Sequence, residues 1–172
     1  MRLKRLMGIV LVFTCIASAT GCAIGFGART NSQKPSGNGR YLTVGDLEIR
    51  GATIVADPKD PSKGVLLATI YNSGQTDDEF VTVNEPPASL DPKDIEQYGP
   101  LDPDATRISG GKALVIRPGR NPQFSVPLIS PKGLLKPGNF VAVNFNFKQT
   151  PDADLKLLVN ANDGIYSDVK VQ

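Results

Sequence analysis

The chain has 172 residues, with 17 glycines, 14 prolines, 19 basic and 17 acidic residues, for a formal net charge of +2. Three basic residues lie within the first five positions, and without them 16 basic residues stand against 17 acidic ones, so the remainder has no overall charge that favours nucleic acid as a partner. The many turn-forming residues disfavour a helical bundle, and the lack of His, with both methionines in the first seven residues, excludes most catalytic and soft-metal chemistry.

Residues 1–21 are predicted to be a lipoprotein signal peptide. Met1–Gly8 carries the three positive charges, and Ile9–Ala17 is apolar but far shorter than the roughly 20 residues that span a bilayer. The following Ala19-Thr20-Gly21-Cys22 resembles the bacterial lipobox, in which the cysteine is diacylated and becomes the first mature residue. An ordinary cleavable signal with an incidental cysteine is the alternative. We expect lipidation of Cys22 and anchoring on the extracytoplasmic face of the cell membrane, since two acyl chains give stable attachment.

Residues 22–40 are predicted to be the acylated cysteine and a disordered tether. The segment after Cys22 is rich in Gly, Ser and Asn, and it carries Arg29, Lys34 and Arg40 with no acidic residue. A flexible chain of this length spans about 20–25 Å on average. Cys15 would leave with the signal, so no disulfide is expected within the mature chain.

Residues 41–172 are predicted to form one all-β domain, because apolar residues recur with a period near two between frequent turn residues. The clearest strand is 140–148, where Val141, Val143, Phe145 and Phe147 alternate with smaller or polar residues. The other expected strands are 42–44, 47–56, 65–72, 79–84, 113–117, 123–128 and 155–160, with a short final strand after the Asp163-Gly164 turn. About eight strands without a helix predict a two-sheet sandwich or a small barrel.

The order of several motifs resembles that of the periplasmic copper chaperones called PCu(A)C. The motifs are Gly51-Ala52-Thr53, the strand ending in Asn72-Ser73-Gly74, Asp77–Val83, Ile116-Arg117-Pro118-Gly119, Leu134–Asn139 and Val141–Phe147. The resemblance spans about Leu47 to Phe147 and implies a cupredoxin-like β-sandwich. Residues 33–44 also resemble the LpqE-like lipoproteins of actinobacteria.

The resemblance does not carry a copper site to this chain. Members that carry Cu(I) use His and Met, including a His-x-Met pair on the strand after the Pro-Gly turn, and Ser125 and Pro127 stand at the matching positions. A hydroxyl and a proline ring cannot replace imidazole and thioether ligands. The segment after Val83 also has no His, Met or Cys. We therefore name no metal ligands and expect no cofactor.

Residues 85–104 are predicted to form a long acidic loop with five prolines, six acidic residues and one lysine. Three alternatives remain open: calcium binding through carboxylates, a solvated connection, or docking of a protein partner. Calcium lacks the spacing of a dedicated binding loop. The candidate docking residues are Asp91, Asp94, Glu96 and Tyr98, with Ile95 and Leu101 as apolar contacts.

Charge is segregated along the chain. Residues 41–104 hold 13 acidic and four basic residues, whereas residues 105–148 hold seven basic residues and no acidic one. Either the two halves neutralise each other across the folded surface, or separate patches form. A basic patch containing Arg117, Arg120, Lys132 and Lys136 would attract lipid headgroups or wall phosphates, at about 1 kcal/mol per cation near an anionic surface.

Enzymatic activity is not expected. Without His or a free Cys, a nucleophile would need a Ser-Lys pair or a carboxylate dyad, and no candidate stands out. Ser109-Gly110-Gly111-Lys112 lacks P-loop spacing and is predicted to be a hairpin turn. The sequence thus predicts a non-enzymatic binding or accessory module of the bacterial cell envelope, whose partners are the membrane, through the lipid, and an unknown envelope protein or wall polymer. The alternative is metal handling, related to copper chaperones or through the carboxylates of residues 85–104.

Overall fold

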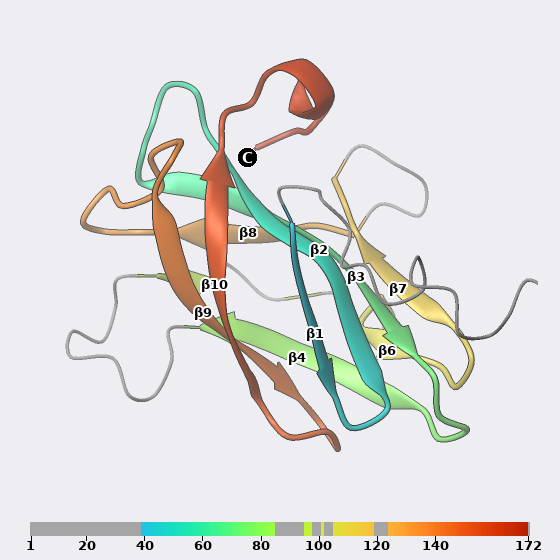
Figure 1. Cartoon of the computed structure of the whole chain (residues 1–172). Helices are drawn as coiled ribbons and strands as arrows, with labels where there is room; N and C mark the ends of the chain where they lie inside the picture. Colours follow the sequence, from blue (N-terminus) through green and yellow to red (C-terminus); the bar gives the residue numbers. More distant parts are fainter. Residues whose placement is uncertain (1–38, 85–94, 98–100, 102–104, 119–123, 172) are drawn as a thin grey trace, which may run out of the picture. The chain divides into compact units, whose positions relative to one another are not determined.

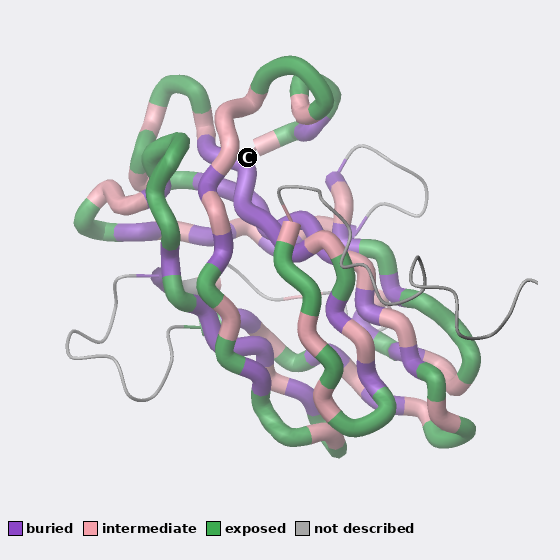
Figure 2. Tube along the Cα trace, in the orientation of Figure 1, coloured by how far each residue is buried: buried purple, intermediate pink, exposed green. Residues whose placement is uncertain are grey.

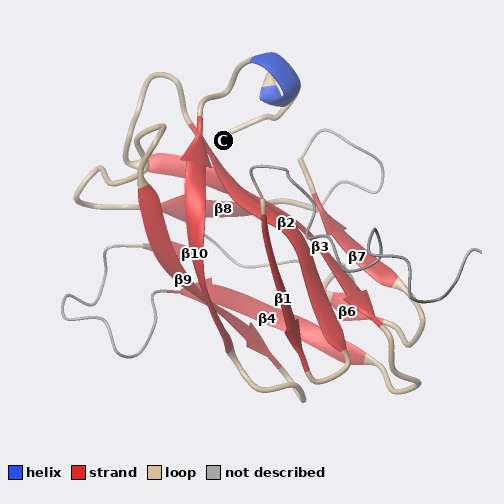
Figure 3. Ribbon diagram, viewed as in Figure 1, coloured by secondary structure: helices blue, strands red, loops and turns tan. Residues whose placement is uncertain are grey.

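The computed structural model describes residues 39–84, 95–97, 101, 105–118 and 124–171. Nearly all of this region is strand and turn, with a single 3₁₀ turn close to the C-terminus (Figure 3). Its elements are β1 (Arg40–Val44), β2 (Leu47–Ala56), β3 (Lys63–Asn72), β4 (Asp78–Asn84), β5 (Glu96–Gln97), β6 (Arg107–Ile108), β7 (Ala113–Ile116), β8 (Val126–Ile129), β9 (Phe140–Phe147), β10 (Ala153–Asn160) and the 3₁₀ turn η3 (Gly164–Tyr166).

The strands pair in the order β1-β2-β10-β9-β4-β5-β8-β3-β7, and a further pairing of β2 with β3 nearly closes the sheet into a barrel (Figure 1). The strands β2 and β3 have ten residues each, the longest of the domain. Each of them pairs with different neighbours along its length. One edge of β2 contacts β1 and then β10, and one edge of β3 contacts β8 and then β7. The β1-β2-β3-β7 strands therefore form one continuous wall of the domain.

A bulge in β2 at Gly51 decides which side chains of this strand face the core. The register against β3 shifts between Arg50 and Thr53, and Gly51 has a φ of 62°, a conformation that favours glycine. Before the bulge, Leu47 and Ile49 are buried; after it, the core positions change to Ala52, Ile54 and Ala56. The extra residue thus reverses the alternation of the strand.

The core lies inside the barrel, where Phe80 contacts three other phenylalanines with ring centroids 6.1–6.3 Å apart. The buried positions follow the inner faces of the strands (Figure 2). A second, smaller cluster lies on the outer side of β2 and β3, where the C-terminal segment packs. It contains Val55, Val65, Leu67 and Val169, with Tyr166 and Val171 against it.

The expected all-β, cupredoxin-like class is confirmed, and most expected strands occur. In β9, Val141, Val143, Phe145 and Phe147 are all buried, as predicted. Asn144, on the opposite face of β9, was expected to be exposed to water, but it is also buried. Its polar side chain is satisfied there, since its amide donates to Asp154 Oδ1 (2.7 Å) and its oxygen accepts from Asn146 Nδ2 (2.5 Å).

Four expectations about elements are corrected. The short strands β5 and β6 were not predicted, and the segment after Asp163-Gly164 forms the 3₁₀ turn η3 instead of a strand. Residues 109–112 do form a turn, in which the Lys112 amide donates to the Ser109 carbonyl (3.0 Å). The flanking strands β6 and β7 pair with β4 and β3 respectively, so the turn links two parts of the fold and is not a hairpin.

In the part of the chain covered by the structure, no helix is long and apolar enough to cross a membrane.

Candidate functional site

The segment that matches the family's copper strand lies at β8. Ser125 immediately precedes β8, and Pro127 lies within it, opposite Val65 of β3; both residues are half-buried. The neighbouring strand β5 pairs with β8 through Glu96 and Ile129, so the structure places the segment after β4 beside this strand. A cavity of about 410 Å³ adjoins β8, lined by Ser62, Lys63, Pro127, Leu128, Ile129, Ser130 and Pro131. These residues supply one cation and no carboxylate, so they offer no site for a metal ion.

A second cavity is lined by three aspartates, and two of them, Asp77 and Asp78, accept structural hydrogen bonds. It lies between the β1–β2 turn and the β9–β10 turn, and its lining includes Asp46, Asp77 and Asp78. The side chain of Asp77 pairs with Arg107 and accepts from the Gly110 amide, which lowers its pKa below the ordinary value. Within the described ranges, no group of three or more His, Cys, Asp or Glu side chains could hold a metal ion.

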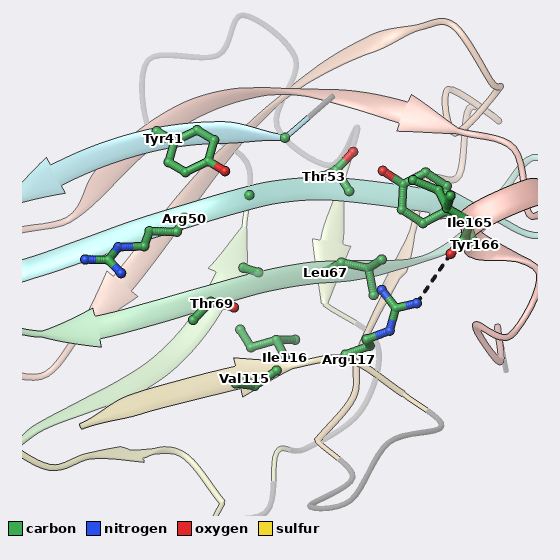
Figure 4. A pocket seen from close by; sticks show the side chains of 13 residues that line it. Tyr41, Arg50, Thr53, Leu67, Thr69, Val115, Ile116, Arg117, Ile165 and Tyr166 are labelled. Carbon is green, nitrogen blue, oxygen red and sulfur yellow. Dashed lines mark hydrogen bonds between the residues drawn. The ribbon is translucent and has the colours of Figure 1, made fainter. Parts of the chain in front are cut away.

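The third cavity is an open groove on the outer side of the β1-β2-β3-β7 wall, which we call the outer groove (Figure 4). Its volume is about 310 Å³. Its lining residues come from all four strands and from the C-terminal segment: Gly39, Tyr41, Arg50, Gly51, Thr53, Leu67, Ala68, Thr69, Val115, Ile116, Arg117, Ile165 and Tyr166.

The bulge in β2 forms the floor of the outer groove. A Cβ atom at Gly51 would lie 4.0 Å from the Tyr41 hydroxyl, so the missing side chain leaves open space beneath that ring. Gly39 packs closely on the Gly51 backbone, and a Cβ there would lie 2.4 Å from the Gly51 carbonyl carbon. Thr53 is fixed in place, because its hydroxyl donates to the Leu158 carbonyl (2.8 Å) and accepts from Asn160 (2.5 Å).

Two arginines lie at opposite ends of the outer groove (Figure 4). At one end, Arg50 donates to Glu48 Oε2 through Nε (3.0 Å) and Nη2 (2.5 Å), and its guanidinium lies 4.9 Å from the ring centroid of Tyr71. The side chains of Arg50 and Glu48 are 48% and 35% exposed, so this ion pair contributes little to folding.

At the other end, Arg117 fastens the C-terminal segment to β7. Its Nη2 donates to Asp168 Oδ1 (2.8 Å) and to the Ile165 carbonyl (3.4 Å). The Arg117 side chain is only 22% exposed, and its Nε is buried and donates to no residue that the structure describes. A buried donor without an acceptor costs free energy.

Several residues expected to carry function are outside the described ranges or have other roles. Cys22, Asp91, Asp94, Tyr98 and Arg120 lie outside the described residues, and Glu96 is placed only by its backbone, in β5. Ile95 was expected to contact a partner, but it is 1% exposed and belongs to the core. Leu101 is partly buried against the same core.

The expected basic residues are also divided. Arg117 lines the outer groove, whereas Lys132 and Lys136 are exposed on the segment between β8 and β9 and do not line it. Elsewhere, Arg107 pairs with Asp77, and Lys148 Nζ lies 2.9 Å from Glu79. These two pairs join the basic half of the sequence to the acidic half, which confirms mutual neutralisation for these four residues.

The sequence interpretation missed Tyr41, Arg50, Ile165 and Tyr166 as members of one site. The signal that was available is Gly51, since a glycine inside a strongly alternating strand indicates a bulge or a close approach. The meeting of β1, β7 and the C-terminal segment over that bulge depends on the topology and has no local signal in the sequence.

No family model matches this sequence, and no curated protein matches it. Solved structures do match: the apo PCuAC domain from PmoF1 (TM-score 0.54, 16% identity, 71% of this chain and 99% of that one), the copper-bound PCuAC domain from PmoF2 (0.53, 14%, 71% and 98%) and the apo PmoF2 PCuAC domain (0.54, 14%, 73% and 98%). At these identities the likeness shows the fold. The described domain therefore has a PCuAC-like, cupredoxin-like β fold.

Proposed function

We propose that this chain is a membrane-anchored, extracytoplasmic lipoprotein that serves as a non-enzymatic binding or accessory module in the bacterial cell envelope. The outer groove carries the proposal. It combines an apolar floor and aromatic walls with two arginines on a stable β scaffold, which is the composition of a ligand site. Its lining residues supply hydroxyl groups from Tyr and Thr but no His, Cys, Asp or Glu to activate them, which favours binding over catalysis.

In this proposal the domain keeps a PCuAC-like fold but lacks the copper site of such domains. The whole sequence has no His, and its methionines are Met1 and Met7, both in the proposed signal. A Cu(I) site of imidazole and thioether ligands therefore cannot form in the domain after the signal is removed. The resemblance of residues 33–44 to the LpqE-like lipoproteins supports this proposal, in which the chain keeps the β fold and binds its partner through the outer groove and not through a copper site.

Anchoring at Cys22 places the groove outside the cytoplasmic membrane. Gly39, near the end of the proposed tether, lines the outer groove. An envelope protein or a wall polymer within reach of the tether is the expected partner, and nucleic acid is not.

Metal handling is the second candidate function, because one similar structure is described as a copper-bound PCuAC domain. Titration calorimetry of the mature, lipidated chain, residues 22–172, in a neutral detergent with Cu(I), Cu(II), Zn²⁺ and Ca²⁺ separates the two. The proposed binding module gives no tight site for any of these ions. Micromolar or tighter binding of one ion would establish metal handling instead.

The binding function is tested in cells with a photocrosslinking side chain placed in the groove. Val115 on β7 is 43% exposed and lines the groove, whereas Val81 on β4 is 48% exposed and does not. We expect a probe at Val115 to form an adduct with an envelope component and the matched probe at Val81 to form none. Equal adducts from both positions, or none from Val115, would contradict the proposal.

A further inference from the structure

We infer that the outer groove binds a small anionic ligand with a ring or apolar body, held by carboxylate or phosphate oxygens on Arg117. This inference rests on the proposed binding function and specifies the ligand class of the same groove. An anionic sugar or a phosphorylated headgroup has this chemistry.

The charge of the groove selects an anion. Its 13 lining residues include two arginines and no acidic residue. The carboxylates that pair with them, Glu48 and Asp168, are not among the lining residues. The only charged side chains in the lining are therefore cations, and the apolar side chains beside them strengthen the attraction of a bound anion.

Arg117 is the group best placed to hold the anion. The planar guanidinium suits bidentate binding of carboxylate or phosphate, and its Nε–H has no acceptor among the described residues. Its present partner Asp168 has a side chain that is 53% exposed, so this ion pair is in contact with water and can be exchanged or shared. An oxygen entering the groove would therefore replace or join Asp168 as an acceptor of the Arg117 guanidinium.

The rest of the groove fits a compact body about the size of a monosaccharide. Tyr41 and Tyr166 contribute aromatic rings to its lining, and Leu67, Val115 and Ile165 contribute apolar surface (Figure 4). Aromatic faces pack well on rings, and the Thr69 hydroxyl adds a polar contact. A volume of about 310 Å³ lies at the small end of ligand pockets.

The test measures binding of three probes to the full-length chain in a neutral detergent, by NMR chemical-shift titration or calorimetry. The probes are glucose 1-phosphate, glucuronate and uncharged glucose. We expect both anions to bind about tenfold or more tightly than glucose. A preference for glucose 1-phosphate indicates a phosphorylated source, and a preference for glucuronate indicates an acidic glycan. Equal affinity for glucose, or no binding of either anion at millimolar concentration, would overturn the inference.

Two variants test whether the anion binds in the outer groove. Arg117→Gln removes the side chain proposed to bind the anion, and Val115→Glu adds a negative charge at a groove position that is 43% exposed. Each should weaken binding of the anions about tenfold or more. The matched controls are Arg107→Gln, which removes an exposed, ion-paired arginine elsewhere, and Val81→Glu; both should bind as the wild type does. Loss of binding in the controls to the same extent would contradict the assignment.

A third variant separates ligand binding from the structural role of Arg117. Asp168→Asn removes the competing carboxylate and leaves the arginine in place. We expect this variant to bind the anions more tightly than the wild type even if its melting temperature falls. Weaker binding in Asp168→Asn would show that Arg117 acts only as a clamp. Crosslinking from Val115 together with no anion binding would reject the ligand class and leave the proposed binding function intact.

Discussion

Asp78 joins the start of β4 to the turn that follows β9. Its Oδ1 accepts from the amides of Glu79 (2.7 Å) and Gln149 (3.0 Å), and its Oδ2 accepts from the amide of Thr150 (2.9 Å). Burial alone would raise the pKa of Asp78, but the hydrogen bonds from Thr150 and the backbone amides outweigh it and hold the pKa below the ordinary value of 3.8. A carboxylate with this many donors serves as a structural tie between two turns.

The first prediction concerns the acid stability that Asp78 provides. Because its folded-state pKa lies below its unfolded-state pKa, the stabilisation is complete above about pH 4 and is lost as the pH falls through the folded-state value. Asp78→Asn should lower the free energy of unfolding by about 1–3 kcal/mol at pH 7, and the difference from wild type should shrink toward pH 3. Urea unfolding at several pH values checks this, and a constant difference across the range would contradict it.

In β9, two neighbouring buried residues, Phe145 and Asn144, contribute to the free energy of unfolding in different ways. Phe145 is 0% exposed and packs against Phe80, with their ring centroids 6.2 Å apart. The neighbouring Asn144 is buried as well, but what it contributes is a pair of hydrogen bonds, to Asp154 and Asn146. Burial of the Phe145 ring should therefore contribute more to the free energy of unfolding than the side-chain hydrogen bonds of Asn144.

We predict that Phe145→Ala lowers the free energy of unfolding by about 3–5 kcal/mol and that Asn144→Ala lowers it by about 1–2 kcal/mol. The larger cost reflects a cavity at the centre of the aromatic cluster. Chemical denaturation of both variants under the same conditions measures the two values. A smaller effect for Phe145→Ala would show that the inner face of β9 is not the main source of stability.

The C-terminal segment is a second element whose role can be measured. Val169 is 3% exposed and covers Val55, Val65 and Leu67 on the outer side of β2 and β3. Val169→Ala should lower the free energy of unfolding by about 1–3 kcal/mol, whereas Val171→Ala, at a half-buried position, should cost less than about 1 kcal/mol. Thermal unfolding compares them, and equal shifts in melting temperature would mean that this outer cluster is not a packed unit.

The elements that the sequence predicted well are those with a long, uninterrupted pattern. β2 was expected at residues 47–56 and occurs there, and the alternation of β9 predicted its buried face. The two-residue strands β5 and β6 carry no periodicity, so only their partners β4 and β8 reveal them. The residues after Gly164 pack against the outer cluster, and this tertiary contact stabilises a 3₁₀ turn where turn chemistry suggested a hairpin.

At the scale of the whole molecule, closure of the sheet explains why the site was harder to predict than the fold. β1 and β7 are at opposite ends of the strand order, yet β2 and β3 between them pair directly and bring both to one wall. Tyr41 and Arg117 therefore line the same groove although 75 residues lie between them in sequence. Periodicity predicts each strand separately, whereas this contact depends on the long-range order of strand pairs.

The last prediction concerns the attachment of the whole molecule to the membrane. If Cys22 is the lipidated residue, Cys22→Ser should abolish the diacyl modification and leave unprocessed precursor or soluble protein. Cys15→Ser is the matched control, because Cys15 lies inside the apolar run of the proposed signal and should have no effect. Detergent-phase partitioning with intact-mass spectrometry of the wild type and both variants gives the readout.

The mass measurement separates the two possible fates of Cys22→Ser, since a retained signal could itself hold the precursor in the detergent phase. The wild type and Cys15→Ser should both have lost 21 residues and gained two acyl chains on a glycerol group. A diacylated Cys22→Ser protein would move the lipid to another residue, whereas a wild type cleaved elsewhere without lipid would remove the membrane anchor from the proposal. The outer groove would then operate on a freely diffusing domain, and its ligand would be captured in solution, without the local concentration that a tether provides near a surface.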